Sequence, residues 1–259
     1  MQIDIDVRLA YEMQAKTDLL LQIEVADFAD QRVESRNLTT TPVDHFVHVA
    51  SEDGMGERLW LRAEGLFECT YQTSVVIDRP ALDLSRVDSV PPHLLPGETV
   101  RYLMPSRYCP SDEFQTFVAA EFGDQTGGAL IATLRDWIEE RFTYAPGSSN
   151  AQTTALDTFV QRRGICRDFA HVLITLARAA AIPARFASVY SPDVTPPDFH
   201  AVAEIYLDGG WHLVDPTGMT TADRMARIGV GADAAEVAFL SAFGRVEMRN
   251  QSVSVTAVE

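Results

Sequence analysis

The sequence predicts an α+β protein in which a β-rich first part precedes a mixed part of helices and strands. Residues 3–9 alternate apolar and polar side chains, as a half-buried strand does, and no convincing helix follows before residue 77. After Pro110 the apolar residues repeat at helical spacing, and a cysteine-bearing helix then leads into a strand and a hairpin. We therefore expect two domains, residues 1–105 and residues 106–259.

The β-rich part is expected to be an antiparallel β-sandwich of immunoglobulin-like architecture. Turn signals such as Gly65 separate its extended segments. These segments cover residues 3–9, 18–26, 43–50, 57–63 and 65–77. Residues 78–110 then carry six prolines, which predicts a connector between the two parts, and Tyr102 and Tyr108 are expected to pack it down.

Three helices are expected before the cysteine. Ser111 is the predicted N-cap of the first, which ends near Phe122. Gly127-Gly128 is expected to break the chain before a second helix over residues 129–142. A polar loop over residues 143–153 and a short helix over residues 154–162 then lead to the cysteine.

Cys166 is expected at the first turn of a helix whose apolar face begins at Phe169 and which Pro183 ends, before a strand over residues 184–190. Unpaired N–H groups at a helix N-terminus carry a charge of roughly +0.5, which favours the reactive thiolate. A free cysteine by itself is more often a small buried hydrophobe. The choice between nucleophile and core residue therefore depends on the partners of Cys166.

His200 and Asp215 are expected at the same end of a hairpin. His200 begins a strand over residues 200–207, and the chain returns through residues 211–217 after a glycine turn. Their side chains share a face if the turn has two residues, at Asp208-Gly209 or Gly209-Gly210, because strand side chains alternate. We expect this even-length turn, or a bulge that restores its pairing.

Cys166, His200 and Asp215 have the residue types and the order that thiol acyl transfer requires. A thiolate attacks a carbonyl carbon, an imidazole holds and returns the proton, and a carboxylate orients the imidazole. Several neighbours are expected to be structural instead: His171 lies about 140° around the helix from Cys166, and Asp168 is expected to cap the helix or pair with an arginine. His212 is expected to face outward. The remaining cysteines, expected to be structural, are Cys69 and Cys109.

Composition excludes several classes of function. With 37 acidic and 21 basic residues the net charge is −16, so a general nucleic-acid binder is not expected. No apolar run approaches the ~18 residues of a membrane span, and the first residues lack a signal-peptide pattern. Three cysteines argue against a disulfide framework, and we expect a cytoplasmic protein. No spacing matches a zinc site, so neither metal nor cofactor is expected.

Two segments, GICRDFAHVLITLARAAAIPARFASVY and FHAVAEIYLDGGWHLVDPT, resemble the bacterial transglutaminase-like superfamily of cysteine peptidases. The core resemblance covers about residues 125–220, and the β-rich part resembles a region often joined to that core. The resemblance implies a papain-like core, with the cysteine helix packed on an antiparallel sheet. It also implies that Cys166 is the nucleophile, His200 the base and Asp215 the orienting acid.

The resemblance implies action on a peptide or protein amide, but it does not decide between hydrolysis, deamidation and transfer to an amine acceptor. An acyltransferase using an acyl-thioester donor, and a non-catalytic protein-binding module, are alternatives. For the oxyanion we expect the backbone N–H of Cys166 as one donor, with the side chains of Asn150 and Gln161 as candidates for a second. Residues 221–259 are expected to add strands or extend a sheet edge, and the oligomeric state is not predicted.

Overall fold

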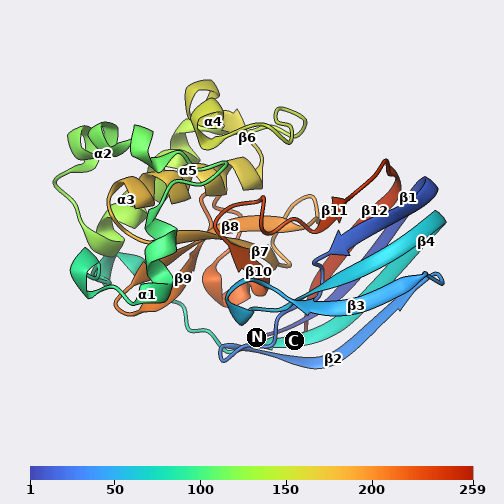
Figure 1. Cartoon of the computed structure of the whole chain (residues 1–259). Helices are drawn as coiled ribbons and strands as arrows, with labels where there is room; N and C mark the ends of the chain where they lie inside the picture. Colours follow the sequence, from blue (N-terminus) through green and yellow to red (C-terminus); the bar gives the residue numbers. More distant parts are fainter. Residues whose placement is uncertain (259) are drawn as a thin grey trace.

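The computed structural model describes residues 1–258 and has two parts, one of long strands and one of helices around a small sheet (Figure 1). The α+β class expected from the sequence is confirmed. No helix within these described residues has both the length and the apolar character needed to cross a membrane.

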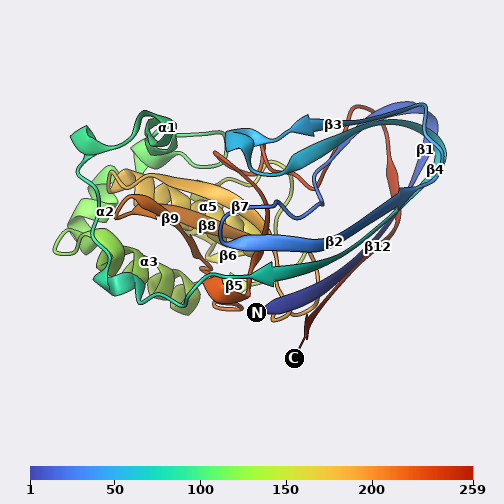
Figure 2. The same cartoon turned by 90° about the horizontal axis from the view of Figure 1, so that it is seen from below.

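Two long antiparallel strands, β1 (Gln2–Leu21) and β4 (Glu57–Ile77), form the centre of a six-stranded sheet. Both strands bend, so each runs through two layers that face one another in Figure 2. The first layer is completed by β2 (Gln31–Thr40) and β12 (Glu247–Val258). The second is completed by β3 (His45–Ala50) and β11 (Leu240–Ala242). The two layers of the expected sandwich are therefore halves of one folded sheet, not the separate sheets of an immunoglobulin-like domain.

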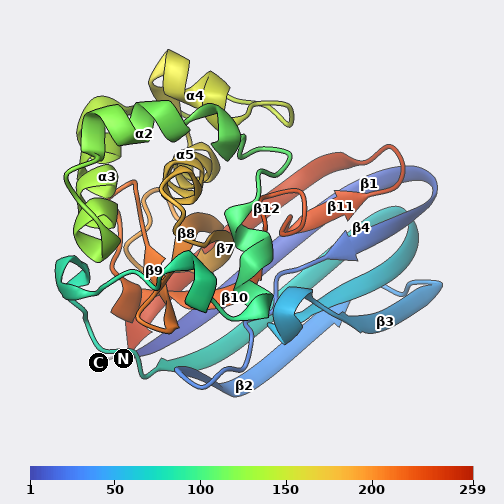
Figure 3. The same cartoon turned by 60° about the vertical axis from the view of Figure 1, so that its left-hand side comes forward.

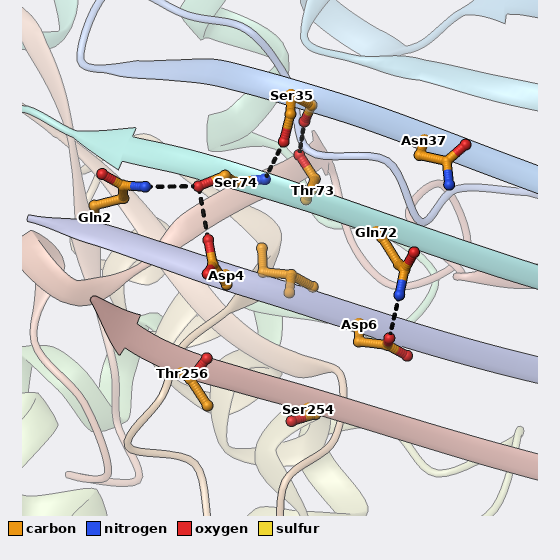
Figure 4. A pocket seen from close by; sticks show the side chains of 11 residues that line it. Gln2, Asp4, Asp6, Ser35, Asn37, Gln72, Thr73, Ser74, Ser254 and Thr256 are labelled. Carbon is orange, nitrogen blue, oxygen red and sulfur yellow. Dashed lines mark hydrogen bonds between the residues drawn. The ribbon is translucent and has the colours of Figure 1, made fainter.

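The alternation of side chains explains why this sheet folds over. Odd-numbered residues from Ile3 to Leu21 and from Leu59 to Ile77 point inward and are nearly all buried. Because the alternation continues through the bend, the two layers share one hydrophobic core. The outer face is polar, and Figure 4 shows a shallow hollow on it, where Gln72 donates a hydrogen bond to Asp6 and Ser74 to Asp4.

The second part is built on a four-stranded antiparallel sheet in the order β10-β7-β8-β9. Its strands are β7 (Ala184–Tyr190), β8 (His200–Leu207), β9 (Gly210–Val214) and β10 (Ala226–Gly231). The central helix α5 (Cys166–Ala179) packs on β7 and β8. Around it lie α2 (Gln115–Phe122), α3 (Gly127–Arg141) and α4 (Ala155–Gln161), as Figure 3 shows.

The helices before α5 differ from expectation at two places. Ser111 is not an N-cap, because it is buried in a 3₁₀ turn (Ser111–Glu113) that precedes α2. Gly127 and Gly128 do not break the chain, because they form the first turn of α3. A Cβ on Gly128 would lie 1.8 Å from the carbonyl oxygen of Leu84, so glycine is needed where α3 approaches the connector.

The connector over residues 78–110 packs down as expected. Its ordered turns include the short helix α1 (Gly97–Val100), and the side chains of Tyr102 and Tyr108 are buried. The Tyr102 hydroxyl donates a hydrogen bond of 2.6 Å to Asp53 in the first part.

The expected domain boundary needs a correction at the C-terminal end. Residues 221–258 do form strands, but only β10 joins the sheet of the second part. The strands β11 and β12 return to β1 in the first part. A second domain of residues 106–259 is therefore wrong for residues 240–242 and 247–258, whose partners lie far away in the sequence.

A buried charge network joins the two parts. The Glu204 side chain on β8 is fully buried, and its carboxylate contacts Arg185 on β7 and Arg227 on β10. Arg185 also donates to Asp53 at 2.6 Å, and Arg227 donates to Asp30, both in the first part. Because a buried charge is tolerated only when paired, this network fixes how β7, β8 and β10 sit against the folded sheet.

Candidate active site

Cys166 is the first residue of α5, and the chain around it is held tightly. The Ile165 backbone N–H donates to Asp168 Oδ2 at 2.9 Å, and Arg167 donates to Asp168 Oδ1 at 2.8 Å. Asp168 therefore caps the helix and pairs with an arginine, as expected. A Cβ on Gly164 would lie 2.7 Å from the Asp168 Cβ, so only glycine permits this approach to the start of the helix.

The hairpin that carries His200 has the even-length turn that the sequence predicts. Leu207 pairs with Gly210, so the turn consists of Asp208 and Gly209. Continuing the observed register from the pair Ala203–Val214 brings Asp215 opposite Val202, on the His200 face of the hairpin. Local register is thus the reason that these two side chains meet.

The imidazole of His200 is fixed by Asp215. His200 Nε2 donates to Asp215 Oδ2 at 2.9 Å, and both side chains are completely buried. Three further donors hold the carboxylate: the Thr217 N–H at 2.9 Å, the Thr217 hydroxyl at 2.7 Å and the Thr220 N–H at 3.2 Å. These donors orient both oxygens of Asp215, which in turn sets the plane of the imidazole.

Cys166 lies on the other side of the imidazole. His200 Nδ1 is buried and has no hydrogen-bond partner among residues 1–258, and Cys166 is half-buried beside it. Burial by itself lowers the pKa of His200, but the hydrogen bond with Asp215 and the neighbouring Cys166 outweigh it and raise that pKa to about 10. The structure therefore brings the three predicted residues together, with His200 between Asp215 and Cys166.

Two comparisons with known proteins show which family has this arrangement. The model of the transglutaminase-like superfamily matches residues 116–216. The crystal structure of a "Putative Cysteine Protease" from Cytophaga hutchinsonii is 31% identical in sequence and superposes with a TM-score of 0.92, over 100% of this chain and 91% of that one. The chain belongs to the transglutaminase-like superfamily. Its fold is that of a thiol-dependent enzyme, as the sequence resemblance implied.

Curated relatives match a shorter stretch. An uncharacterized protein of Mycobacterium leprae is 31% identical over 119 residues, which cover 42% of this chain and 42% of that protein. An uncharacterized protein of Mycobacterium tuberculosis is 29% identical over 145 residues, or 49% of this chain and 46% of that protein. The matches thus span less than half the length of these relatives.

One residue beside Cys166 in this transglutaminase-like core was not predicted. Tyr144 lies in a two-residue strand, β5 (Thr143–Tyr144), within the stretch expected to be a polar loop, and β5 pairs with β6 (Arg163–Gly164). Burial, and then the neighbouring Cys166, raise the pKa of Tyr144, so its hydroxyl lies near the start of α5. The only local signal is a polar Thr143 between the aromatic residues Phe142 and Tyr144, which is too short to predict a strand.

The two side chains expected as further oxyanion donors are not assembled with Cys166. Asn150 is exposed, and its Oδ1 accepts the Gln152 N–H at 2.8 Å to close a local turn. Gln161 is exposed at the end of α4. Within residues 1–258 neither amide donates a hydrogen bond to Cys166 or His200, because the loop and the helix surface turn them to solvent.

The two other histidines and two other cysteines weighed from the sequence lie in structural positions. The His171 ring is fully buried, stacks on Tyr108 with 5.0 Å between centroids and accepts the Ala234 N–H, and burial lowers its pKa to about 3. His212 does not simply face outward: it is half-buried and its Nε2–H donates to the carbonyl of Leu207. Both other cysteines, Cys69 and Cys109, are buried.

Within residues 1–258 no group of three or more His, Cys, Asp or Glu side chains is arranged to hold a metal ion. The site itself offers a thiol at a helix N-terminus, an imidazole that is held in one orientation and a carboxylate that accepts several hydrogen bonds.

Proposed function

We propose that this protein is a thiol-dependent enzyme that acts on the amide carbonyl of a peptide or protein through an acyl-enzyme intermediate. The supporting observation is the position of His200, which gives one ring nitrogen to Asp215 and leaves the other beside Cys166. In this proposal Cys166 is the nucleophile, His200 the general base and acid, and Asp215 the orienting group.

Acylation would begin with the Cys166 thiolate, paired with the His200 imidazolium. The sulfur attacks the carbonyl carbon, a C–S bond forms, and the carbonyl π electrons move onto oxygen. The raised pKa of His200, about 10, keeps its proton available at neutral pH. That proton passes to the leaving nitrogen as the C–N bond breaks, which leaves a thioester on Cys166 and a free amine.

Deacylation would use the same groups in reverse. The neutral imidazole takes a proton from water or from an amine, which attacks the thioester carbon, and the C–S bond breaks to restore the thiolate and imidazolium. Water gives hydrolysis or deamidation and an amine gives transamidation, so the acceptor and the amide substrate define the reaction.

Product analysis tests this function. The wild-type protein and Cys166→Ser are incubated with a mixture of glutamine-containing peptides, with and without a biotin-labelled primary alkylamine. Mass spectrometry then distinguishes peptide cleavage, side-chain deamidation and amine incorporation. We expect at least one product class from the wild type and none from Cys166→Ser. Equal product formation by both proteins would contradict the assignment of the nucleophile.

A further inference from the structure

The backbone of Tyr144 is tied to the segment that leads into Cys166. In the parallel pair of β5 and β6, Tyr144 lies opposite Gly164. The Thr143 N–H donates to the Arg162 carbonyl, and the Ala145 N–H donates to the Gly164 carbonyl, both at 2.8 Å. These bonds on both sides of Tyr144 hold it in a fixed place relative to the first turn of α5.

The side chain of Tyr144 combines an anchored ring with a hydroxyl at the reactive centre. Its ring packs against Phe169 of α5, with 6.0 Å between centroids, and borders the core of the second part. Its backbone lies opposite Gly164, two residues before Cys166, and Cys166 is close enough to the hydroxyl to raise its pKa. The residue is half-buried, so part of its surface remains open to solvent.

The place beside the Cys166 N–H is where an acyl oxygen must lie during attack by sulfur. A backbone N–H at a helix N-terminus is a natural donor to such an oxygen, and efficient stabilisation uses more than one fixed donor. A bound carbonyl oxygen can accept this N–H while the phenol of Tyr144 turns its O–H onto the same oxygen.

We propose that the Tyr144 hydroxyl is the second oxyanion donor of this enzyme and acts together with the backbone N–H of Cys166. This inference rests on the proposed thiol acyl transfer. Burial and the neighbouring Cys166 raise the pKa of Tyr144, so the phenol keeps its proton and remains a donor throughout the reaction.

The step can be written for 4-nitrophenyl acetate, an activated ester that needs no natural substrate. Sulfur attacks the ester carbon, a C–S bond forms and the π electrons become the oxyanion, which accepts hydrogen bonds from the Cys166 N–H and the Tyr144 O–H. The oxyanion then collapses, the bond to the leaving oxygen breaks, and 4-nitrophenolate departs. The acetyl group stays on sulfur, and no other reagent is consumed.

Two reactions of Cys166 in the variant Tyr144→Phe test the proposal. Acetylation by 4-nitrophenyl acetate passes through an oxyanion, whereas alkylation by iodoacetamide displaces iodide directly and forms none. We expect Tyr144→Phe to slow acetylation by about 100-fold, in line with the loss of one oxyanion donor, and to leave alkylation within about twofold of wild type. Tyr206→Phe, in which a hydroxyl is removed from the far end of β8, is the matched control and should change neither rate.

Three outcomes would overturn this role for Tyr144. Unchanged acetylation would show that the hydroxyl does not contact the oxyanion, and faster acetylation would show that it blocks the site. An equal loss in both reactions would show that it only maintains the reactivity of the thiol. Failure of the proposed function is a separate result, because wild-type Cys166 would then react with neither reagent faster than a simple thiol does.

Discussion

His200 Nε2 lies 2.9 Å from Asp215 Oδ2 in a place that solvent does not reach. The contact follows from the two-residue turn at Asp208-Gly209, which sets the register of β8 against β9. It leaves His200 Nδ1 as the ring nitrogen beside Cys166. The turn at the far end of this hairpin thus sets the register that brings Asp215 to Nε2 and leaves Nδ1 for the thiol.

Replacing Asp215 by Asn tests the value of this contact for catalysis. The variant keeps the shape of the side chain but removes the charge that favours the correct tautomer and the imidazolium. We expect the rate of Cys166 acetylation to fall by about 100-fold or more, with the fold retained by circular dichroism. Asp208→Asn, at the exposed turn of the same hairpin, is the control. Wild-type rates in Asp215→Asn would mean that the carboxylate has no part in the reaction.

The titration of His200 gives a second prediction. Its pKa in the folded protein, about 10, lies above the ~6.5 of an unfolded histidine. The group therefore contributes stability that is fully present below about pH 6.5 and is lost as the pH rises through about 10. NMR titration of ring-labelled protein should show His200 protonated at neutral pH, with a lower pKa in Asp215→Asn. A His200 ring that is neutral at pH 7 in the wild type would contradict the charge state inferred from the geometry.

The titration of His171 should make stability depend on pH in the opposite direction to that of His200. Burial lowers its pKa to about 3, so below about pH 6.5 the unfolded chain binds a proton that the folded protein does not. Its contribution is present above pH 6.5 and is lost as the pH falls toward 3, at roughly 1 kcal/mol per pH unit. His171→Gln retains an acceptor for the Ala234 N–H but does not titrate. Urea unfolding from pH 7 to pH 5 should show a steeper loss for the wild type than for the variant, and parallel losses would refute this.

Glu204 should stabilise the contact between the two parts of the protein and so raise the free energy of unfolding. Its replacement by Gln removes the carboxylate that Arg185 and Arg227 share, and leaves each buried arginine with one acidic partner, Asp53 or Asp30. We expect a loss of about 3 kcal/mol in the free energy of unfolding, which is typical when one partner of a buried ion pair is removed. Asp6→Asn, which breaks an exposed pair with Arg8, is the control and should leave the urea midpoint unchanged. Equal midpoints for both variants would show that the network is not needed for stability.

The candidate site was largely predictable because its signals are local. The helical periodicity after Phe169 and the proline at 183 define α5, and strand alternation with a short glycine turn defines the register that joins His200 to Asp215. Tyr144 was missed because a two-residue strand has no periodicity of its own, and its partner Gly164 is distant in sequence.

The architecture of the first part was less predictable. Strong alternation in β1 and β4 identified strands, but it continues through the bend and does not show that each strand belongs to two layers. The return of β11 and β12 to β1 depends on pairing across most of the chain, which no local pattern encodes. Gly128 was also misinterpreted. Glycine is typical of a helix break, but it is also needed where a helix packs closely against another segment, as α3 does at Leu84.

Alkylation by iodoacetamide, followed residue by residue with mass spectrometry from pH 5 to pH 10, tests the activation of Cys166 most directly. Burial raises the pKa of Cys69 and of Cys109 to about 12, so both should stay unlabelled in the folded protein. Cys166 should react near neutral pH faster than glutathione does, and His200→Gln should abolish this advantage. A Cys166 that reacts no faster than glutathione, or equally fast with and without His200, would contradict the proposed nucleophile.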